Sequence, residues 1–502
     1  MKIQRLLLMA AFTAAMATPA PPTGAMNLNL AVPWSDKCSP PQTPYLAFYS
    51  PQSADMLFSP EMLGLRQSSL EFLCQAGLRS VSMTWSLHRN MIIKPFRAGK
   101  AESLPANRFR IRIAPEGLPP GFYDLKVVLD TGMETKDAKD KRPVTGVCVF
   151  GWRAGEMAVR DTRPADFISF WDKAKARLAA IPLNARNETP MVTFDRIRIN
   201  AYNVSSACLP ADYDPDGHKT EEVESCKISF AGPDGGRVYA WLAKPKGPGP
   251  FPAMLVLPGA GFAARPRPLE HARHGYLAID IQIHGQDVDL PRYQPLPGYY
   301  EEFRFEPVEA YYYYNVHLRV MQAVHYLVSR ADVDARRIVA VGGSQGGRLS
   351  LVIAGLEGRI AAAVSGIAHS SNYPHLHWVA RCNGLDKPWD KASDPKLAGR
   401  IKSDGMDMPG KPPALTDADG RCLAYYDPMN FAQDIRCPLL MNAGLTDPVS
   451  PPSSVWAAYN RVASMDKTLV PLPGIAHDWS SEFDRRAWRW LDEKLGASTS
   501  RR

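Results

Sequence analysis

The sequence predicts an α/β fold, in which a mainly parallel sheet is covered by helices, preceded by a small all-β domain. Three observations predict it. Residues 31–155 contain segments that alternate polar and apolar residues at period two, and they contain no long helical pattern. From about Pro250 onward, short apolar runs alternate with helical patterns, which is typical of a parallel sheet with helices on both faces. One of these runs ends in a glycine-flanked serine, Ser344, at a junction between strand and helix.

Residues 1–25 are expected to be a signal peptide rather than part of the fold. Lys2 and Arg5 precede an apolar stretch, Leu6–Ala17, which is followed by small residues and prolines, and cleavage is expected after Ala17 or Ala25. We therefore expect a secreted or periplasmic protein. No later segment approaches the about 18 apolar residues that a membrane-spanning helix needs, so no membrane span is expected.

The composition and motifs argue against several function classes. The chain has a formal net charge of only +8 and no block of basic residues, so a nucleic-acid partner is not expected. It has neither a phosphate-binding loop nor a dinucleotide fingerprint, so no cofactor is expected. His375 and His377 lack an accompanying cluster of cysteines or carboxylates. Asp212–Gly217 resembles the start of a calcium loop, but Val223 stands where the bidentate glutamate belongs. No metal site is expected.

The N-terminal region is predicted to be a β-sandwich accessory domain over residues 31–155. Phe109–Ile113 and Tyr123–Leu129 both alternate apolar with polar residues, and a turn rich in proline and glycine separates them. A further strand is expected over Val144–Trp152. Strands with one solvated face and no catalytic motif suggest an immunoglobulin-like domain that acts as a spacer or as a carbohydrate-binding surface.

Residues 156–502 are predicted to form the catalytic domain. Its first helix has apolar residues at helical spacing between Phe167 and Ile181, and short strands follow, one of them around Val192–Ile199. The later strands are expected at Ala253–Leu257, Leu277–Ile283, Ile338–Val341, Ala362–Ile367, Pro438–Asn442 and Leu469–Leu472. A final helix is expected over Glu482–Leu495.

Ser344 is the candidate nucleophile. The β-branched run before it, the glycines around it and the apolar helical pattern after it form strand, sharp turn and helix, which is the context of a nucleophile elbow. Such a turn forces the serine into a cramped backbone conformation that leaves little room for side chains at Gly342 and Gly346. The hydroxyl would then lie at a helix N-terminus, where amide groups favour developing negative charge.

A serine nucleophile needs a base and an orienting carboxylate, and α/β-hydrolases place them in the chain order serine, acid, histidine. Of the histidines after Ser344, His477 alone follows a late strand and precedes the last helix, so it is the candidate base. Asp447, in the loop after the preceding strand, is the candidate acid. Asp478 is the second choice, because neighbouring side chains usually diverge. This order makes the α/β-hydrolase fold the predicted fold of the catalytic domain.

Two backbone N–H groups are expected to form an oxyanion hole. The first is that of Gln345, directly after the nucleophile. The second is expected in the turn Pro258–Phe262, which follows the strand Ala253–Leu257. Ala260 is the candidate there, because the glycines on either side let its amide face inward.

The eight cysteines permit disulfides in an exported chain, but their spacing does not determine the pairing. The candidate pairs are Cys38 with Cys74, Cys208 with Cys226 and Cys382 with Cys422, whereas Cys148 and Cys437 are expected to be buried thiols. The connectivity stays open at this point.

Several segments of the chain form a specific set of motifs together with the serine turn. They are Arg163-Pro164-Ala165-Asp166-Phe167, the tyrosine-rich helix leading to Gly342–Gly347, Tyr425–Asn430, Gly444–Asp447, Pro451–Ser454 and Ala457–Asn460. In these motifs the chain resembles a known family, the acetyl xylan esterases and cephalosporin C deacetylases of carbohydrate esterase family 7. The resemblance spans Arg163 to Leu495. It implies a Ser344–His477–Asp447 triad, an acetylated oligo- or polysaccharide as substrate, and a possible homo-oligomer.

The chain departs from the family pattern at three places. His284 stands where the family has the arginine of an Arg-Gly-Gln motif, so the group which that arginine anchors must be held differently. Ala476 and Asp478 flank the candidate base where the family has glycine and glutamate. Pro258-Gly259-Ala260 replaces a His-Gly-aromatic turn beside the expected oxyanion hole.

Two other functions stay open at this point. One is a serine peptidase that resembles prolyl oligopeptidase, although residues 31–155 are too few for its β-propeller, in which each blade takes about 40 residues. The other is a catalytically inert carbohydrate-binding protein on a hydrolase fold, against which the complete set of serine, aspartate and histidine argues. Loops shape the pocket, so the natural ester within the class of acetylated sugars also stays open.

Overall fold

The computed structural model describes residues 46–63, 69–77, 80–131, 144–206, 218–294, 304–369, 371–382, 417–478 and 480–495. The chain divides into two compact units. The first comprises the residues up to Val159 together with 443–456 and 471–478, and the second comprises the rest. The expected signal peptide and the Asp212–Gly217 loop lie outside the described residues.

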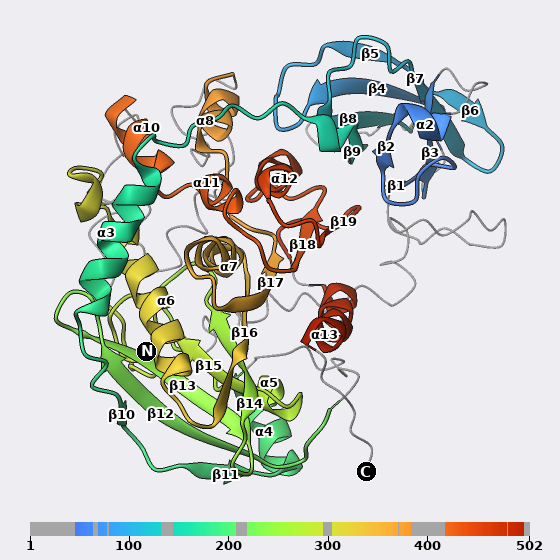
Figure 1. Cartoon of the computed structure of the whole chain (residues 1–502). Coiled ribbons are helices and arrows are strands. Elements are labelled where there is room, and N and C mark those ends of the chain that lie inside the picture. The colour runs from blue at the N-terminus through green and yellow to red at the C-terminus, as the bar shows by residue number, and fades with distance from the viewer. Residues whose placement is uncertain are drawn as a thin grey trace, which may run out of the picture. The chain divides into compact units, whose positions relative to one another are not determined.

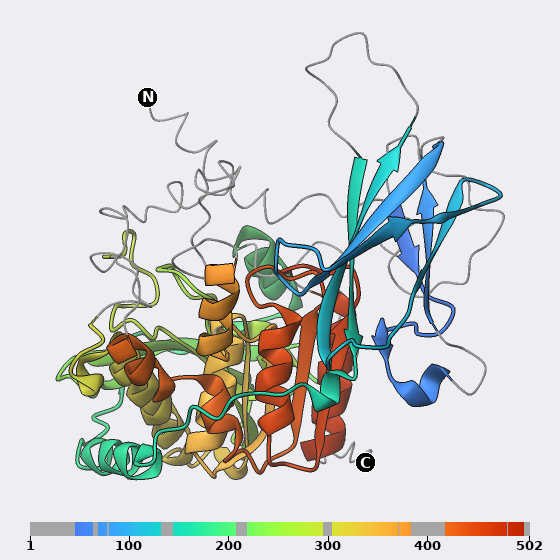
Figure 2. The same ribbon diagram turned by 90° about the horizontal axis from the view of Figure 1, so that it is seen from above.

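The first unit contains two β-sheets, drawn in blue to teal in Figures 1 and 2. Its elements are β1 (Leu46–Tyr49), β2 (Leu57–Phe58), α2 (Pro60–Leu63), β3 (Leu70–Ala76), β4 (Ser82–Arg89), β5 (Arg97–Lys100), β6 (Glu102–Leu104), β7 (Arg108–Ile113), β8 (Gly121–Asp130), β9 (Val144–Trp152) and η2 (Ala154–Glu156). One sheet has the strand order β1-β3-β7-β6 and the other β2-β9-β8-β4-β5. Neighbouring strands are antiparallel except β2 and β9, which are parallel.

The two sheets share one core through alternate residues. In β3 every second side chain from Leu70 to Ala76 is buried, which is the periodicity of a strand with one inward face. The ring of Phe72 in β3 lies 4.9 Å from that of Phe150 in β9, so strands of different sheets pack together. The alternating segment Phe109–Ile113 lies within β7, and its apolar residues are the buried ones.

The second unit is organised around a ten-stranded sheet. The remaining elements of the described residues are α3 (Phe167–Ala179), β10 (Arg186–Asn187), β11 (Val192–Phe194), α4 (Arg196–Ser206), β12 (Val223–Ala231), β13 (Arg237–Pro245), β14 (Phe251–Leu257), α5 (Leu269–Arg273), β15 (Leu277–Ile281), η4 (Val308–Ala310), α6 (Tyr312–Val328), β16 (Val333–Gly343), α7 (Gln345–Leu356), β17 (Ile360–Gly366), α8 (Tyr373–Cys382), α10 (Asp417–Ala424), α11 (Pro428–Ala432), β18 (Leu439–Gly444), α12 (Pro452–Arg461), β19 (Lys467–Leu472) and α13 (Ser481–Leu495). The strand order is β10-β12-β13-β15-β14-β16-β17-β18-β19, and β11 pairs with β12. The neighbouring strands β15, β14, β16, β17 and β18 are parallel to one another, whereas β12 and β13 are antiparallel to their neighbours.

The parallel strands are continuous apolar runs because helices cover both faces of the sheet. α5 and α13 lie on one face, and α6 and α7 lie on the other (Figure 1). On the first face, Phe483 and Leu491 of α13 belong to a buried cluster with three residues of the sheet, Met254 in β14, Val339 in β16 and Leu440 in β18. Each such side chain contributes roughly 1.5–3 kcal/mol when it is fully buried.

The expectation of a strand over Val192–Ile199 is wrong beyond Phe194, where β11 ends. α4 begins two residues later, at Arg196. Asp195 between them accepts the backbone N–H of Arg198 through Oδ1 at 2.8 Å, which caps the start of the helix. The capping aspartate therefore overrides the strand preference of the β-branched residues around it.

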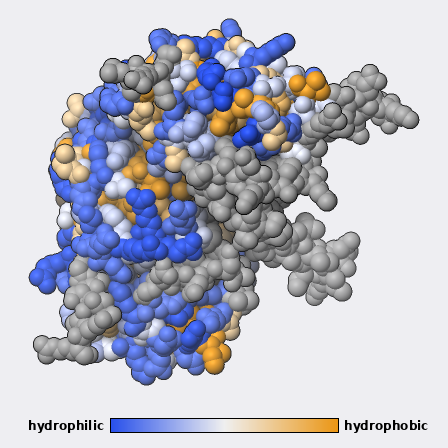
Figure 3. Space-filling view, turned by 90° about the vertical axis from the view of Figure 1, so that its right-hand side faces the viewer, coloured by the Kyte–Doolittle hydropathy of each residue, from blue (hydrophilic) through white to orange (hydrophobic). Residues whose placement is uncertain are grey.

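Figure 3 shows a face of the molecule on which hydrophilic residues predominate and hydrophobic residues gather in small groups. Among the described residues, no helix is both long and apolar enough to cross a membrane, and no three His, Cys, Asp or Glu side chains are placed to hold a metal ion. The side chains of Cys38, Cys208 and Cys382 lie outside the described set, so the three candidate disulfides stay predictions. Cys148 is buried and Cys437 is half-buried.

Candidate active site

Ser344 occupies the turn between β16 and α7. Its φ of 56° and ψ of −119° lie in a region that is strained for any residue with a side chain, which is the conformation expected of a nucleophile elbow. Backbone hydrogen bonds hold it there. The Ser344 N–H donates to the carbonyl of Gly366 at 2.9 Å, and the Ser344 carbonyl accepts the N–H groups of Arg348 at 3.0 Å and His369 at 3.1 Å. The neighbouring strand and helix therefore enforce the strained conformation.

Close backbone contacts require the glycines around Ser344. A Cβ atom at Gly342 would lie 2.6 Å from the carbonyl carbon of Gly346. A Cβ atom at Gly346 would overlap the carbonyl oxygen of Leu257, at the end of β14. The glycines thus bring the first turn of α7 against the sheet, which places the partly positive N-terminus of the helix at the serine.

The turn that carries Ala260 is tied to the elbow by the side chain of Gln345. This side chain is fully buried, and its Nε2 donates to the carbonyl of Gly259 at 3.0 Å. Its Oε1 accepts the hydroxyl of Tyr313 at 2.8 Å. Ala260 itself is exposed. The side chain of Gln345 thus holds the backbone directly before Ala260, so one hydrogen bond joins the two segments that carry the residues predicted for the oxyanion hole.

His284 holds the other end of the same turn. Its Nε2 lies 3.0 Å from the carbonyl oxygen of Gly261, and its Nδ1 is hydrogen-bonded to the hydroxyl of Tyr312. The imidazole also packs on the ring of Phe262, with the centroids 4.3 Å apart. Desolvation, together with the positive charge of Arg319, lowers the pKa of His284 to about 3, so the imidazole is neutral at ordinary pH.

In the first unit, Asp447 and His477 form a hydrogen-bonded pair, with Nδ1 of His477 2.7 Å from Oδ2 of Asp447. Asp447 is buried, and its Oδ1 accepts the backbone N–H groups of Val449 at 2.7 Å and Ser450 at 2.8 Å. Because both carboxylate oxygens are engaged, the carboxylate is fixed in orientation. The imidazole is fixed in turn, with Nδ1 toward the acid and Nε2 on the opposite side of the ring.

The segments that carry this pair, which we call the acid loop (443–456) and the base loop (471–478), are joined backbone to backbone. The N–H of Thr446 donates to the carbonyl of Ile475 at 3.1 Å. A Cβ atom at Gly444 would lie 2.6 Å from that same carbonyl oxygen, so glycine is needed for the loops to approach this closely.

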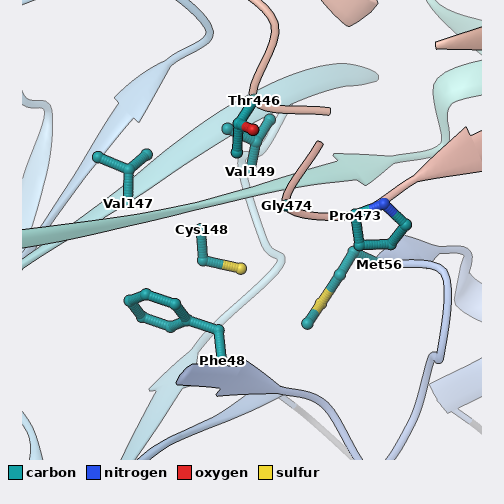
Figure 4. Close-up of a pocket in the computed structure, with 8 residues that line it drawn as sticks. All are labelled: Phe48, Met56, Val147, Cys148, Val149, Thr446, Pro473 and Gly474. Carbon is teal, nitrogen blue, oxygen red and sulfur yellow. The ribbon is translucent and has the colours of Figure 1, made fainter. Parts of the chain in front are cut away.

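A small pocket within the first unit is lined by both loops and by the N-terminal β-region (Figure 4). Thr446 of the acid loop and Pro473 of the base loop share it with Met56 and with Cys148 of β9. Burial raises the pKa of the Cys148 thiol to about 12, so it stays protonated. The two loops and the N-terminal β-region therefore border the same small cavity.

Two tyrosines at the start of α6 were not identified from the sequence as part of the site. Tyr312 and Tyr313 are adjacent, and their hydroxyls contact His284 and Gln345 respectively. The hydroxyl of a buried tyrosine usually has a hydrogen-bond partner. The cluster of tyrosines at the start of this helix is therefore the signal in the sequence from which these polar contacts could have been expected.

The profile of the family described as acetyl xylan esterase (AXE1) matches residues 200–390 and 416–494, which together make up more than half of the chain. Among known proteins, the acetyl esterase Axe7A of Xylanibacter ruminicola is 26% identical over 387 residues, which cover 75% of this chain and 75% of that protein.

Two solved structures share the fold. The acetyl xylan esterase from Paenibacillus sp. R4 has a TM-score of 0.50 and 24% identity, covering 68% of this chain and 98% of that chain. Acetyl xylan esterase 1 from Thermoanaerobacterium sp. JW/SL YS485 has a TM-score of 0.51 and 21% identity, covering 68% of this chain and 97% of that chain. The predicted α/β-hydrolase fold is thereby confirmed.

Proposed function

Because this chain belongs to the acetyl xylan esterase family and is thus a carboxylic ester hydrolase, we propose that it is a secreted serine esterase that removes acetyl groups from carbohydrates. The observation that carries the proposal is the strained Ser344 at the turn between strand and helix. An ordinary helix start has no need of that strain. The Asp447–His477 hydrogen bond supports the proposal independently. The acetyl group and the sugar follow from the family and from the acetyl esterase among its relatives.

In the proposed reaction, Ser344, His477 and Asp447 act as a triad. Nε2 of His477 takes the hydroxyl proton of Ser344 while Oγ attacks the acetyl carbonyl carbon. Asp447, 2.7 Å from Nδ1, keeps that nitrogen protonated and stabilises the imidazolium that forms. The imidazolium then protonates the sugar oxygen as its bond to the acetyl carbon breaks. Water hydrolyses the acetyl-serine by the same steps, which release acetate and restore the hydroxyl.

The negative charge of the tetrahedral intermediate is proposed to be bound by the backbone N–H groups of Ala260 and Gln345. Gln345 is the first residue of α7, so the positive end of the helix adds to its N–H group. Loss of one donor from such a hole typically lowers kcat by about 10²–10³-fold.

Acetate release by Ser344→Ala tests the proposal. We expect turnover to fall by about 10⁴-fold or more, because no nucleophile remains, while the melting temperature stays within a few degrees of that of the unchanged protein. Ser329→Ala, at the C-terminal end of α6, is the matched control and should keep full activity. Near-normal turnover in Ser344→Ala would rule the mechanism out.

A substrate panel then separates the esterase from the alternatives. It contains acetylated xylo-oligosaccharides, other acetylated glycans, cephalosporin C and peptides. We expect acetate from the acetylated sugars, and its dependence on Ser344 excludes an inert binding protein. Peptide cleavage without acetate release would instead favour the peptidase.

A further inference from the structure

The side chains of Gln345 and His284 contact the turn that carries Ala260 at two points. Nε2 of Gln345 donates to the carbonyl of Gly259 at 3.0 Å, and Nε2 of His284 lies 3.0 Å from the carbonyl oxygen of Gly261. The two contacts therefore bracket Ala260, one on each side. Neither Gln345 nor His284 is a member of the proposed triad.

The contact to Gly259 sets the direction of the Ala260 N–H group. The carbonyl of Gly259 and the N–H of Ala260 belong to one trans peptide unit, which is planar, so the two groups point in opposite directions. The fully buried Gln345 amide draws the carbonyl oxygen toward the interior. The N–H of Ala260 must then point away from that interior, and Ala260 is exposed to solvent.

The Gly259 carbonyl decides which end of the Gln345 amide faces the turn, because a carbonyl oxygen can only accept a hydrogen bond. An amide turned by about 180° would place Oε1 against the Gly259 oxygen, and two acceptors repel each other. In the orientation that the carbonyl selects, Oε1 accepts the hydroxyl of Tyr313 at 2.8 Å, so both ends of the buried amide are hydrogen-bonded.

The contact to Gly261 requires one particular form of His284. A carbonyl oxygen only accepts, so Nε2 must carry the proton, and in a neutral imidazole Nδ1 is then the acceptor for the Tyr312 hydroxyl. The lowered pKa of His284 agrees with this neutral form. Gly261 has a φ of 110°, a conformation that glycine adopts without steric cost, so the imidazole selects one of several backbone conformations that are open to this residue.

We propose that the side chains of Gln345 and His284 are positioning residues that clamp this turn, so that the Ala260 N–H is aimed at the oxyanion before substrate binds. The inference rests on the proposed serine-esterase function. A donor oriented in advance stabilises the transition state without a reorientation cost. Because neither side chain contacts the substrate in this role, their loss lowers kcat and leaves KM nearly unchanged.

Three variants test the clamp: Gln345→Met, His284→Leu and His284→Gln. The measurements are kcat and KM for 4-nitrophenyl acetate and the inhibition constant of trifluoroacetone, a ketone that forms a tetrahedral adduct with a serine. Active sites are counted with an irreversible serine reagent. We expect kcat to fall by about 10–100-fold in Gln345→Met and about 10-fold in His284→Leu, below the full loss of a donor. His284→Gln should recover most of the activity, because its amide N–H can replace the imidazole N–H.

The inhibition constant separates a positioning role from a structural one. If the clamp aims an oxyanion donor, the inhibition constant rises by the same factor by which kcat/KM falls. Two outcomes would overturn the proposal. In the first, both the kcat per active site and the inhibition constant of the variants equal those of the unchanged protein. In the second, kcat falls but the inhibition constant does not change. His325→Gln, on the opposite end of α6, is the matched histidine control. If Gln345→Met does not fold, the two His284 variants decide.

Together with Ser344→Ala, these variants also separate the proposed clamp from the proposed serine-esterase function on which it rests. An active Ser344→Ala variant would remove the serine mechanism, whatever the clamp variants do. An inactive Ser344→Ala variant beside clamp variants of normal kcat would leave the esterase standing and remove the clamp alone.

Discussion

The hydroxyl of Ser453 in the acid loop donates a hydrogen bond to Oδ1 of Asn90 at 3.1 Å. Asn90 in turn donates through Nδ2 to Oδ1 of the buried Asp124 in β8 at 2.8 Å. Nearby, the ring of Phe122 in β8 packs on that of Trp456, with centroids 4.7 Å apart. Within the first unit, the N-terminal sheet thus supports the loop that carries the candidate acid.

Asn90→Ala should therefore destabilise the protein. The change leaves the buried carboxylate of Asp124 and the hydroxyl of Ser453 each without one partner, and we expect a loss of about 1–3 kcal/mol in the free energy of unfolding. Urea unfolding measures it. Ser453→Ala keeps the bond between Asn90 and Asp124 and should cost less. Equal losses in the two variants would show that the Asp124 bond contributes little.

Asp447→Asn should abolish most of the activity without disturbing the fold. The amide keeps an oxygen for the N–H groups of Val449 and Ser450 but cannot stabilise the imidazolium of His477, so we expect kcat to fall by up to about 10⁴-fold. Asp478→Asn is the matched control and should retain activity. A larger loss in Asp478→Asn would identify Asp478 as the acid instead.

Replacing each of two adjacent glycines by alanine should have different effects on the stability of the fold. Gly342→Ala forces a methyl group to within 2.6 Å of the Gly346 backbone, and overlaps of this kind typically cost about 1–3 kcal/mol or more. At Gly343 a Cβ atom would meet nothing within 4 Å, so Gly343→Ala should be neutral. Thermal melting of the two variants, with circular dichroism as the signal, distinguishes them. Similar melting points would show that the elbow relaxes easily.

Acid should weaken the fold through buried neutral histidines. Desolvation, with a smaller effect of His274, lowers the pKa of His271 to about 4, whereas an unfolded histidine titrates near about 6.5. Between these values the unfolded chain binds the additional proton, so the stabilising contribution is present above about 6.5 and is lost as the pH falls toward about 4.

Urea unfolding at several pH values between about 4.5 and 7 measures this effect. The free energy of unfolding should decrease by up to about 1.4 kcal/mol per pH unit from His271 alone. His271→Gln should remove that part of the slope. An identical slope in the variant would assign the acid sensitivity to other groups.

The fold was predictable from the sequence where one physical signal dominated. Strands buried on both faces, such as the run within β16, are continuously apolar, and the order of Ser344, Asp447 and His477 along the chain follows their strands. At Val192–Ile199 two signals competed. The side chain of Asp195 capped a helix where β-branched residues favoured a strand.

The surroundings of the site were not predictable, because they depend on contacts between residues far apart in the chain. Gln345 and Gly259 are separated by 86 residues, and His284 and Gly261 by 23. No local pattern encodes such a pair. The resemblance to a family indicated that position 284 was unusual, but the role of the imidazole followed only from its two hydrogen bonds.

The candidate base lies in the segment after β19, which ends at Leu472, forms one edge of the ten-stranded sheet and is half-buried along most of its length. An edge strand with few buried side chains opens locally at a lower free energy than the core. Amide hydrogens of β19 should therefore exchange with solvent faster than those of the central strand β16. On heating, His477 would lose its place while most of the sheet is still intact, so catalysis should fail at a temperature below the global melting midpoint.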